Sequence, residues 1–177
     1  FKARLVVLGN RWKPNAEDNS VYASVVSQVG NRCAMVQIAK AGFTPVPFDI
    51  SNAFIRASMG STRVCVKLPE SFRDPKIPNG DGKRMLLKAL YGLPISPGLW
   101  AKTLSRDLIK LGWTECPHEP GVWTLREENQ IVGFMTVYVD DCILACNAPE
   151  KTAIELDKVH KLHPLSIITT EKADDGT

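Results

Sequence analysis

The stretch best suited to chemistry is the acidic pair Asp140-Asp141, which interrupts an apolar, partly β-branched run over residues 131–146. Two adjacent carboxylates cost several kcal/mol when buried without partners, so they are expected in a turn. The long apolar flanks predict strands that hold this turn rigidly inside a sheet. Rigid carboxylate oxygens are what a hard divalent cation such as Mg²⁺ requires, so the pair is either a metal site or an ordinary surface turn.

A further carboxylate, Asp49, lies in a second apolar segment with the sequence VPFDI. Taken alone, Asp49 is explained by an ordinary helix cap or strand-end turn. If the two segments are neighbours in a sheet, three carboxylates converge. Two ions about 3.5–4 Å apart between them would then match phosphoryl-transfer enzymes, where one ion activates the attacking oxygen and the other stabilises the leaving group.

The elements that must position these residues follow from hydrophobic spacing and from proline and glycine. Ser96-Pro97 predicts a helix start, and the spacing of Trp100, Leu104 and Leu108 predicts its buried face. Strands are expected at residues 1–8, 43–50, 64–68, 122–126 and 131–139. Helices are expected at residues 21–40 with a break near Gly30, at 96–111 and at 149–162, and a short helix is expected to begin near residue 52. Loops are expected at residues 10–20 and 74–83. Hairpin-linked strands alternating with helices indicate an α+β fold.

The composition excludes several classes of protein. With 177 residues, 44% hydrophobic and 23% charged, the chain is neither collagen-like, nor coiled-coil, nor fully disordered. The net charge of +3 permits an anionic partner without requiring one. The longest charge-free apolar stretch, residues 131–139, is far shorter than the ~20 residues of a membrane span.

Five cysteines without a CxxC or Cys-His pattern predict structural thiols in a reducing compartment. Because the chain starts with Phe1, we expect a piece of a longer polypeptide.

Five sequence blocks occur in the order and spacing of a known family. They are KARLV at residues 2–6, DISNAF at 49–54, VCVKLPESF at 64–72, LYGL at 90–93 and YVDD at 138–141. Together they cover roughly residues 1–147, and the chain resembles the reverse transcriptase domain of copia-type long-terminal-repeat retrotransposons, a fragment of a Gag-Pol-like polyprotein.

The resemblance implies a fingers-and-palm fold, in which the palm is a ferredoxin-like antiparallel sheet backed by helices. Residues 1–42 and about 60–95 would be fingers-like, and residues 43–59 and 96–165 would form the palm. Thumb and ribonuclease H segments are not expected within residues 1–177.

The implied activity is RNA-directed and DNA-directed DNA polymerisation, in which a primer 3′-hydroxyl attacks a deoxynucleoside triphosphate. Asp49 and Asp140 would be catalytic metal ligands and Asp141 the neighbouring third carboxylate, binding two Mg²⁺ ions that Mn²⁺ could replace. The implied partners are an RNA template, a DNA primer and template, and a dNTP, without a membrane. The implied location is the cytoplasm, in a virus-like particle, with the nucleus as the alternative.

Five further residues match the family's nucleotide-binding positions. Lys2 and Arg4 would hold the triphosphate, although they could instead be a solvated basic strand end. Phe54 would be a steric gate against the ribose 2′-hydroxyl, or else a core residue. Tyr91 and Gly92 would lie on the template and nucleotide side, although the glycine could equally serve the turn alone.

The chain departs from the family pattern at two places: Pro94-Ile95 stands where relatives often have Lys-Gln after LYGL, and the proline-bearing TPVPFD at residues 44–49 stands where many relatives have a less constrained strand. Two other functions stay open. One is a catalytically inactive remnant that binds nucleic acid or partners. The other is a two-metal nuclease using the same carboxylates, which the basic KARLV block and bulky Phe54 disfavour because both suit a triphosphate substrate.

Overall fold

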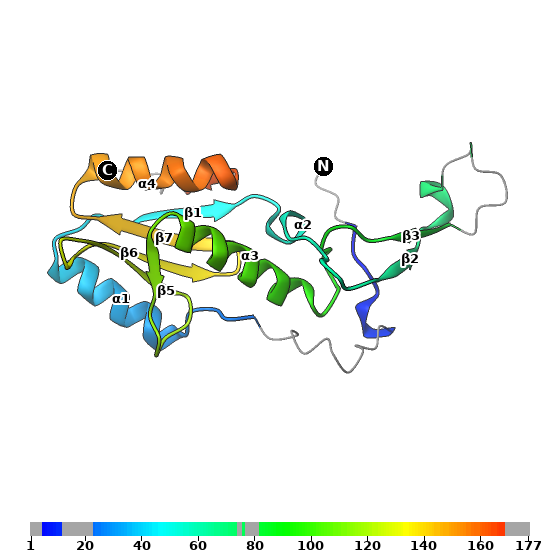
Figure 1. Cartoon of the computed structure of the whole chain (residues 1–177), viewed down its shortest axis with the longest axis horizontal. Helices are drawn as coiled ribbons and strands as arrows, with labels where there is room; N and C mark the ends of the chain where they lie inside the picture. The colour runs from blue at the N-terminus through cyan, green and yellow to red at the C-terminus, as the bar shows by residue number, and fades with distance from the viewer. Residues whose placement is uncertain (1–4, 12–22, 74–75, 77–81, 169–177) are drawn as a thin grey trace, which may run out of the picture. The chain divides into compact units, whose positions relative to one another are not determined.

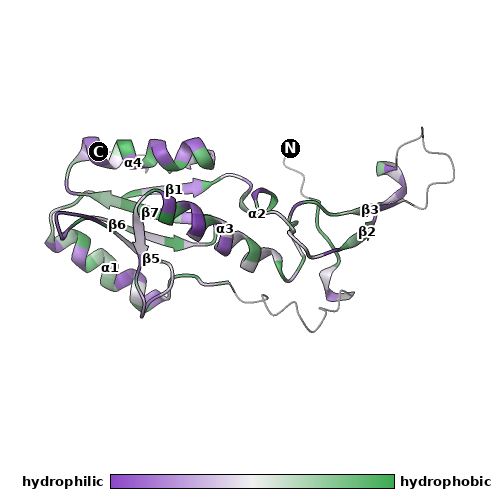
Figure 2. Ribbon diagram, viewed as in Figure 1, coloured by the Kyte–Doolittle hydropathy of each residue, from purple (hydrophilic) through white to green (hydrophobic). Residues whose placement is uncertain are grey.

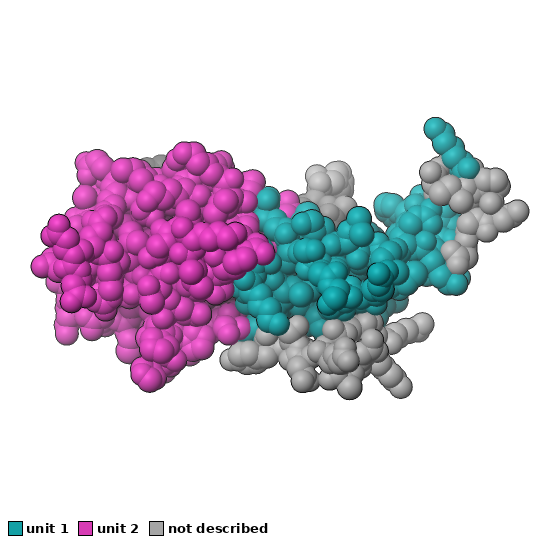
Figure 3. Space-filling view, viewed as in Figure 1, with its two compact units in different colours: residues 1–23, 54–103 teal, residues 24–53, 104–177 magenta. Residues whose placement is uncertain are grey.

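The computed structural model describes residues 5–11, 23–73, 76 and 82–168. Its contacts divide the chain into two compact units, shown in teal and magenta in Figure 3. Unit 1 comprises residues 1–23 and 54–103, and unit 2 comprises residues 24–53 and 104–177. All strand pairs among the described residues are antiparallel, which confirms an α+β fold with an antiparallel sheet. None of the described helices is both long and apolar enough to cross a membrane.

Unit 2 is built on a six-stranded sheet with the order β4-β5-β6-β7-β1-β8. The strands are β1 (Val46–Ile50), β4 (Trp113–Glu115), β5 (Val122–Glu127), β6 (Gln130–Tyr138), β7 (Asp141–Cys146) and β8 (Leu165–Ile167). Strands β4 to β7 form a meander of sequence neighbours. In contrast, β1 lies between β7 and β8 although it precedes both by more than 85 residues in the chain. The predicted hairpin at residues 122–139 is confirmed, with Glu128 and Asn129 at positive φ in its turn.

Helices flank the sheet of unit 2. In Figure 1, strands β1, β7 and β6 run between α4 (Pro149–Leu162) above and α1 (Gln28–Lys40) below. Figure 2 shows apolar and polar residues alternating along α4, as expected for a helix with one buried face. The largest buried side chains of this unit include Phe48, Leu144, Met135, Trp113 and Val159. The predicted bounds of α4 are confirmed, with Pro149 in its first turn.

Helix α1 starts later than predicted. It begins at Gln28 rather than near residue 21, because the Ser27 hydroxyl accepts the Gly30 N–H at 2.9 Å and caps the helix there. The Glu119 carboxylate also accepts the Ser27 N–H at 2.8 Å and lies at the positive end of the helix dipole. The predicted break near Gly30 is therefore wrong, since Gly30 lies in the first turn. Gly42, with φ +71°, follows the end of the helix as predicted.

Unit 1 contains a two-stranded sheet of β2 (Cys65–Lys67) and β3 (Lys83–Met85), with single turns of 3₁₀ helix at Gly9–Arg11 and Glu70–Phe72. The short helix α2 (Ala53–Arg56) begins where the sequence predicted. Ala57, Ala89, Leu93, Ile95 and Trp100 are almost fully buried in this unit. The described part of the predicted first strand, residues 5–8, is not a strand. Instead, the Val7 N–H donates to the Tyr91 carbonyl at 2.8 Å.

Helix α3 (Ser96–Lys110) begins in unit 1 and ends in unit 2. Trp100, Leu104 and Leu108 are at most 3% exposed, so the predicted buried face is confirmed. At about 25 cal/mol per Å² of apolar area, that burial is worth several kcal/mol. Ser96 is not the helix cap that its position suggested. Its buried hydroxyl donates to the Leu90 carbonyl at 2.6 Å and accepts the Leu90 N–H at 3.1 Å, because these backbone groups need partners inside unit 1.

Candidate active site

The acidic pair lies at a tight hairpin between β6 and β7. Tyr138 pairs with Asp141 across the hairpin, so Val139 and Asp140 form a two-residue turn. Of these two, only Val139 has a positive φ, at +61°. A β-branched residue seldom adopts this conformation, and it persists only where the surrounding structure enforces it. The two long strands therefore hold Asp140 and Asp141 in a fixed place.

Strand β1 brings the third carboxylate to the same place. Asp49 is directly opposite Asp141 in the β1–β7 pair, and the Ile50 N–H donates to the Asp140 carbonyl at 2.9 Å. Because ladder hydrogen bonds alternate, Asp49 and Asp141 occupy a position between bonded pairs, where facing side chains approach most closely. The Cβ atoms of such pairs are about 4.5–5.5 Å apart. The predicted adjacency of the Asp49 strand and the acidic hairpin is confirmed.

A row of four residues crosses the sheet at this end. Ser166 in β8 pairs with Asp49, which pairs with Asp141, which pairs with Tyr138. Residues directly opposite one another in antiparallel strands point to the same face, so these four share one face of the sheet. Asp49 and Asp140 are half-buried, whereas Asp141 and Tyr138 are exposed. Within unit 2, this end of the face is thus partly exposed to solvent.

The electrostatics agree with a concentration of negative charge here. Burial raises the pKa of the neighbouring Cys142 thiol, and the charges of Asp141, Asp140 and Asp49 raise it further. All three carboxylates therefore act on one buried atom. Cys142 is therefore a neutral thiol at physiological pH.

The donor set fits a hard divalent cation that also binds substrate. Among the described residues, no group of three or more His, Cys, Asp or Glu side chains is arranged to hold an ion by protein ligands alone. Mg²⁺ in phosphate-processing sites rarely needs such a cage, since one or two carboxylates, waters and substrate phosphates complete its octahedron. Asp49 and Asp141 supply two facing carboxylates, and Asp140 is the next residue along the chain.

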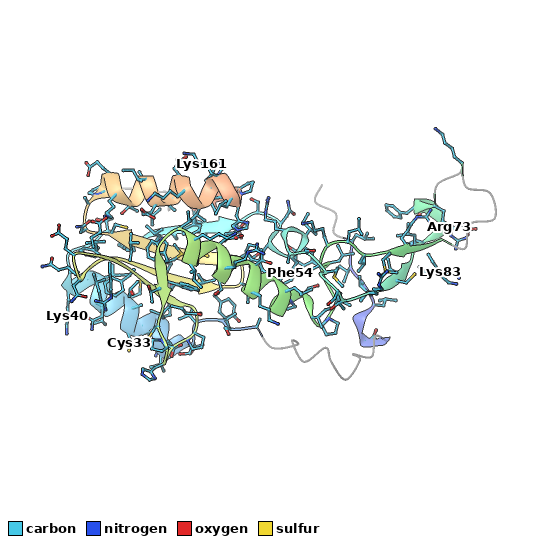
Figure 4. All side chains as sticks on the ribbon, in the orientation of Figure 1. Cys33, Lys40, Phe54, Arg73, Lys83 and Lys161 are labelled. Carbon is cyan, nitrogen blue, oxygen red and sulfur yellow. The ribbon has the colours of Figure 1, made fainter. Side chains whose placement is uncertain are left out.

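The predicted nucleotide-binding residues belong to unit 1. Lys2 and Arg4 lie outside the described residues. The ring of Phe54 packs against that of Tyr91, with 4.8 Å between centroids and an interplanar angle of 55°. Phe54 lies in α2 and is labelled in Figure 4. The structure thus brings Phe54 and Tyr91 together, while Asp49, Asp140 and Asp141 form a separate group in unit 2.

Gly92 has a structural reason to be glycine that involves no nucleotide. Its φ is +83°, and a Cβ atom there would overlap the carbonyl oxygen of Val7 and the side chain of Val6. The backbone of residues 6–7 passes directly over the LYGL loop, held by the bond from Val7 to Tyr91. Packing of the chain therefore accounts for this glycine.

We expect Gly92→Ala to destabilise unit 1 by more than about 2 kcal/mol, since it combines left-handed backbone strain with overlap against main-chain atoms. Gly60→Ala is the matched control, because Gly60 has φ +57° and no described atom lies within 4 Å of its Cβ position. Thermal unfolding of both variants separates the cost of the left-handed backbone, which both share, from the cost of the overlap, which only Gly92→Ala has. Equal melting temperatures would show that the Val7 segment moves aside without cost.

A groove of about 450 Å³ lies beside this segment in unit 1. Its lining is apolar except for Lys67, and it is formed by residues 5–8, 64–69 and Leu90. Among the described residues, this lining offers one cationic side chain, whereas a triphosphate needs several cationic or N–H donors.

The net charge of +3 conceals a strong separation of charge between the units. Unit 1 contains 13 basic and 5 acidic residues, a net charge of +8, whereas unit 2 contains 9 basic and 14 acidic residues, a net charge of −5. In the β2–β3 hairpin, Lys67 lies directly opposite Lys83, which Figure 4 labels. Adjacent ammonium groups attract anions. The whole-chain charge considered in the sequence analysis misses this basic unit.

Sequence reasoning also missed two members of the row of four residues. Tyr138 could have been found, because a two-residue turn at Val139 and Asp140 necessarily pairs it with Asp141. Ser166 left no signal in the sequence, since its place beside Asp49 depends on a strand pairing across more than 110 residues.

The fold and the site define a class: an α+β domain whose central antiparallel strands present facing carboxylates at one end. Comparison with known families agrees, because the reverse transcriptase (RNA-dependent DNA polymerase) family matches residues 1–167. The chain belongs to the reverse transcriptase family, and the resemblance to copia-type retrotransposons is confirmed by its relatives.

Three relatives illustrate the similarity. The retrovirus-related Pol polyprotein from transposon RE1 of Arabidopsis thaliana is 28% identical over 159 residues, covering 90% of this chain and 11% of the relative. The corresponding polyprotein from transposon TNT 1-94 of Nicotiana tabacum is 24% identical over 149 residues, or 81% of this chain and 11% of the relative. A Ty5-1 transposon protein of Saccharomyces cerevisiae is 28% identical over 120 residues, or 66% of this chain and 38% of the relative. The chain thus spans about a tenth of the two Pol polyproteins. No solved structure shows a significant match.

Proposed function

We propose that this chain is the metal-binding part of an RNA-directed DNA polymerase that also copies DNA, and that Asp49, Asp140 and Asp141 bind two Mg²⁺ ions. The observation that supports this most directly is the pairing of Asp49 with Asp141 beside the Val139-Asp140 turn. Two sequence segments about 90 residues apart contribute carboxylates to one face of a rigid sheet. A plain surface turn explains Asp140 and Asp141, but it does not explain Asp49 opposite them.

The topology supports the assignment of unit 2 as a palm. Along the chain, β1, α3, β6, β7, α4 and β8 occur in the β-α-β-β-α-β order of a ferredoxin-like fold, with α2, β2 and β3 inserted before α3 and β4 and β5 inserted before β6. Their strands lie in the order β8-β1-β7-β6, which is the ferredoxin-like arrangement. Unit 1 would then be fingers-like. Helix α1, which the sequence analysis grouped with the fingers-like residues, belongs to unit 2 by its contacts.

The residues have distinct tasks in this proposal. When bound, the two ions would lower the pKa of the primer hydroxyl and neutralise charge on the triphosphate. Asp49 and Asp140 would each contribute carboxylate oxygens from backbone held rigidly by the β1–β7–β6 ladder. Asp141, which is more exposed, faces Asp49 across the strand pair and would add a third negative charge to the metal site.

Unit 1 would bind the polyanionic template, primer and dNTP. Its net charge of +8 supports this role, because each contact between a phosphate and a Lys or Arg side chain releases counterions. Lys2 and Arg4 would bind the triphosphate, and Tyr91 and Gly92 would line the nucleotide side. Phe54 would exclude the ribose 2′-hydroxyl. The family resemblance also supports action in a cytoplasmic particle.

A non-catalytic remnant that binds nucleic acid is the second candidate, and one observation favours it. Ile95, which stands where relatives often have a polar residue, is 1% exposed and packs inside unit 1. This side chain therefore cannot contact a template. No observation of this kind favours a two-metal nuclease. The positive charge of unit 1 does not distinguish a nuclease from a polymerase, because a basic surface binds a triphosphate and a polyanionic template equally well.

The deciding experiment is primer extension on poly(rA)/oligo(dT) with Mg²⁺, using the chain extended through the segments that follow it in its relatives. Extension that requires the divalent cation would support the polymerase. Retained nucleic-acid binding without extension would favour the remnant. Metal-dependent shortening of the primer would favour the nuclease.

A further inference from the structure

The end of β1 that bears Asp49 is held from two sides. On one side, the Ile50 N–H donates to the Asp140 carbonyl of the acidic hairpin at 2.9 Å. On the other side, the Ser51 N–H donates to the Pro164 carbonyl at 2.9 Å, and the hydroxyls of Ser51 and Ser166 lie 3.4 Å apart. The connection between α4 and β8 therefore fixes the backbone two residues beyond Asp49.

That connection is short and weakly supported by its own strand. Strand β8 has only three residues, lies at the edge of the sheet, and contains Ser166 and Ile167, which are both exposed. Edge strands of this length contribute few ladder bonds and little buried area, so they open easily. The Leu165 N–H donates to Nδ1 of His160 and the Ile168 N–H to the Pro47 carbonyl, both at 3.1 Å, and a further interaction anchors the connection at residue 163.

His163 provides that interaction. It directly follows α4, its N–H donates to the Val159 carbonyl at 2.8 Å, and its side chain is buried. The imidazole Nε2 lies 3.3 Å from Oδ2 of Asp107, which belongs to α3. The residue after His163 is Pro164, whose carbonyl accepts the Ser51 N–H.

Asp107 is built to stay charged although it is buried. Burial alone would raise its pKa, but hydrogen bonds from Arg106 and Lys110 outweigh this effect and lower the pKa below its ordinary value. The Arg106 Nε and the Lys110 Nζ donate to Oδ1 at 3.0 Å and 3.3 Å. The Arg106 Nη2 donates to Oδ2 at 3.3 Å, and Oδ2 is also the oxygen that faces His163. A buried carboxylate of this kind attracts and orients the imidazole that faces it.

We propose that the Asp107–His163 pair is a latch that positions Asp49 for metal binding by fixing the α4–β8 connection against the end of β1. The proposal rests on the proposed function, since it presumes that Asp49 binds a cation. Both residues act through backbone contacts and are positioning residues, because neither lies in the row that contains Asp49. Substitution of residues that position a metal ligand commonly lowers metal affinity by roughly 10–100-fold.

The test uses the whole 177-residue chain and two measurements. Amide hydrogen exchange at Ser51 reports the latch directly, and titration with Mn²⁺ followed by electron paramagnetic resonance reports the metal site. We expect His163→Leu and Asp107→Asn to accelerate Ser51 exchange by about tenfold or more and to weaken Mn²⁺ binding by roughly tenfold. His163→Gln retains a side-chain donor toward Asp107 and should restore most of both properties.

Thr152→Ala is the matched control for a general loss of stability. Thr152 is buried in the same helix, but its hydroxyl binds Cys146 and Ala148 at the opposite end of β7. At equal loss of melting temperature, this variant should leave Ser51 exchange and Mn²⁺ affinity near those of the wild type. The comparison is made at temperatures where every variant is folded to the same extent.

The outcomes separate the two proposals. Unchanged Ser51 exchange and unchanged Mn²⁺ affinity in His163→Leu would overturn the latch and leave the proposed function intact. Faster Ser51 exchange with unchanged Mn²⁺ affinity would also overturn it, since the anchored backbone would not position the ligand. A wild-type chain that binds no Mn²⁺, or binds it equally well as Asp49→Asn, would instead overturn the proposed metal site.

Discussion

Replacing Asp49 or Asp140 by Asn is expected to reduce nucleotide addition by at least about 10²–10³-fold while leaving the fold intact. Each change removes a negative charge from the candidate metal site but conserves the size of the side chain. Both residues are half-buried beside a ladder of backbone bonds that does not depend on their side chains. Asp141→Asn should have a smaller effect, because its carboxylate is the most exposed of the three.

Primer extension rates and melting temperatures of the same preparations check this prediction. Glu128→Gln is the matched control, since Glu128 is an exposed carboxylate in the two-residue turn of the neighbouring hairpin. It should leave the rate unchanged. Near-normal extension by Asp140→Asn would rule out the polymerase mechanism, whatever happened at Asp141.

Substituting Phe54 by Val is expected to raise ribonucleotide incorporation relative to deoxyribonucleotide incorporation by about ten- to a hundredfold. A rigid ring excludes one extra oxygen by overlap at a cost of roughly 1–3 kcal/mol, and 1.36 kcal/mol corresponds to about a factor of ten. Steady-state incorporation of rNTP and dNTP on the same primer measures this ratio.

The contact between Phe54 and Tyr91 defines the control for that measurement. Phe54→Val loses the ring pair, whereas Phe54→Tyr keeps a ring of the same shape. If Phe54 is a gate, the Tyr variant keeps the sugar preference and the Val variant loses it with little change in melting temperature. A Val variant that unfolds earlier and still selects dNTP would make Phe54 a packing residue.

Local patterns in the sequence determined much of the fold. The bounds of α4, the buried face of α3, the β5–β6 hairpin and the turn at Asp140 all depend on spacing within about 15 residues, and all are confirmed. Such features are encoded locally because helix and hairpin periodicities repeat over short windows. Two predictions at this level were wrong. The Ser27 hydroxyl caps α1, so the helix begins at Gln28, and in residues 5–8 the Val7 N–H donates to the Tyr91 carbonyl in place of a strand ladder.

The sequence by itself also identified Asp49, Asp140 and Asp141 as candidates, but only the tertiary structure decided that Asp49 faces Asp141. It likewise decided that His163 meets Asp107. It also showed that charges summing to +3 separate into units of +8 and −5. The reason is the same in each case. Partners of this kind are brought together by the packing and register of the assembled elements, and these depend on how the whole core is buried rather than on any local pattern of residues.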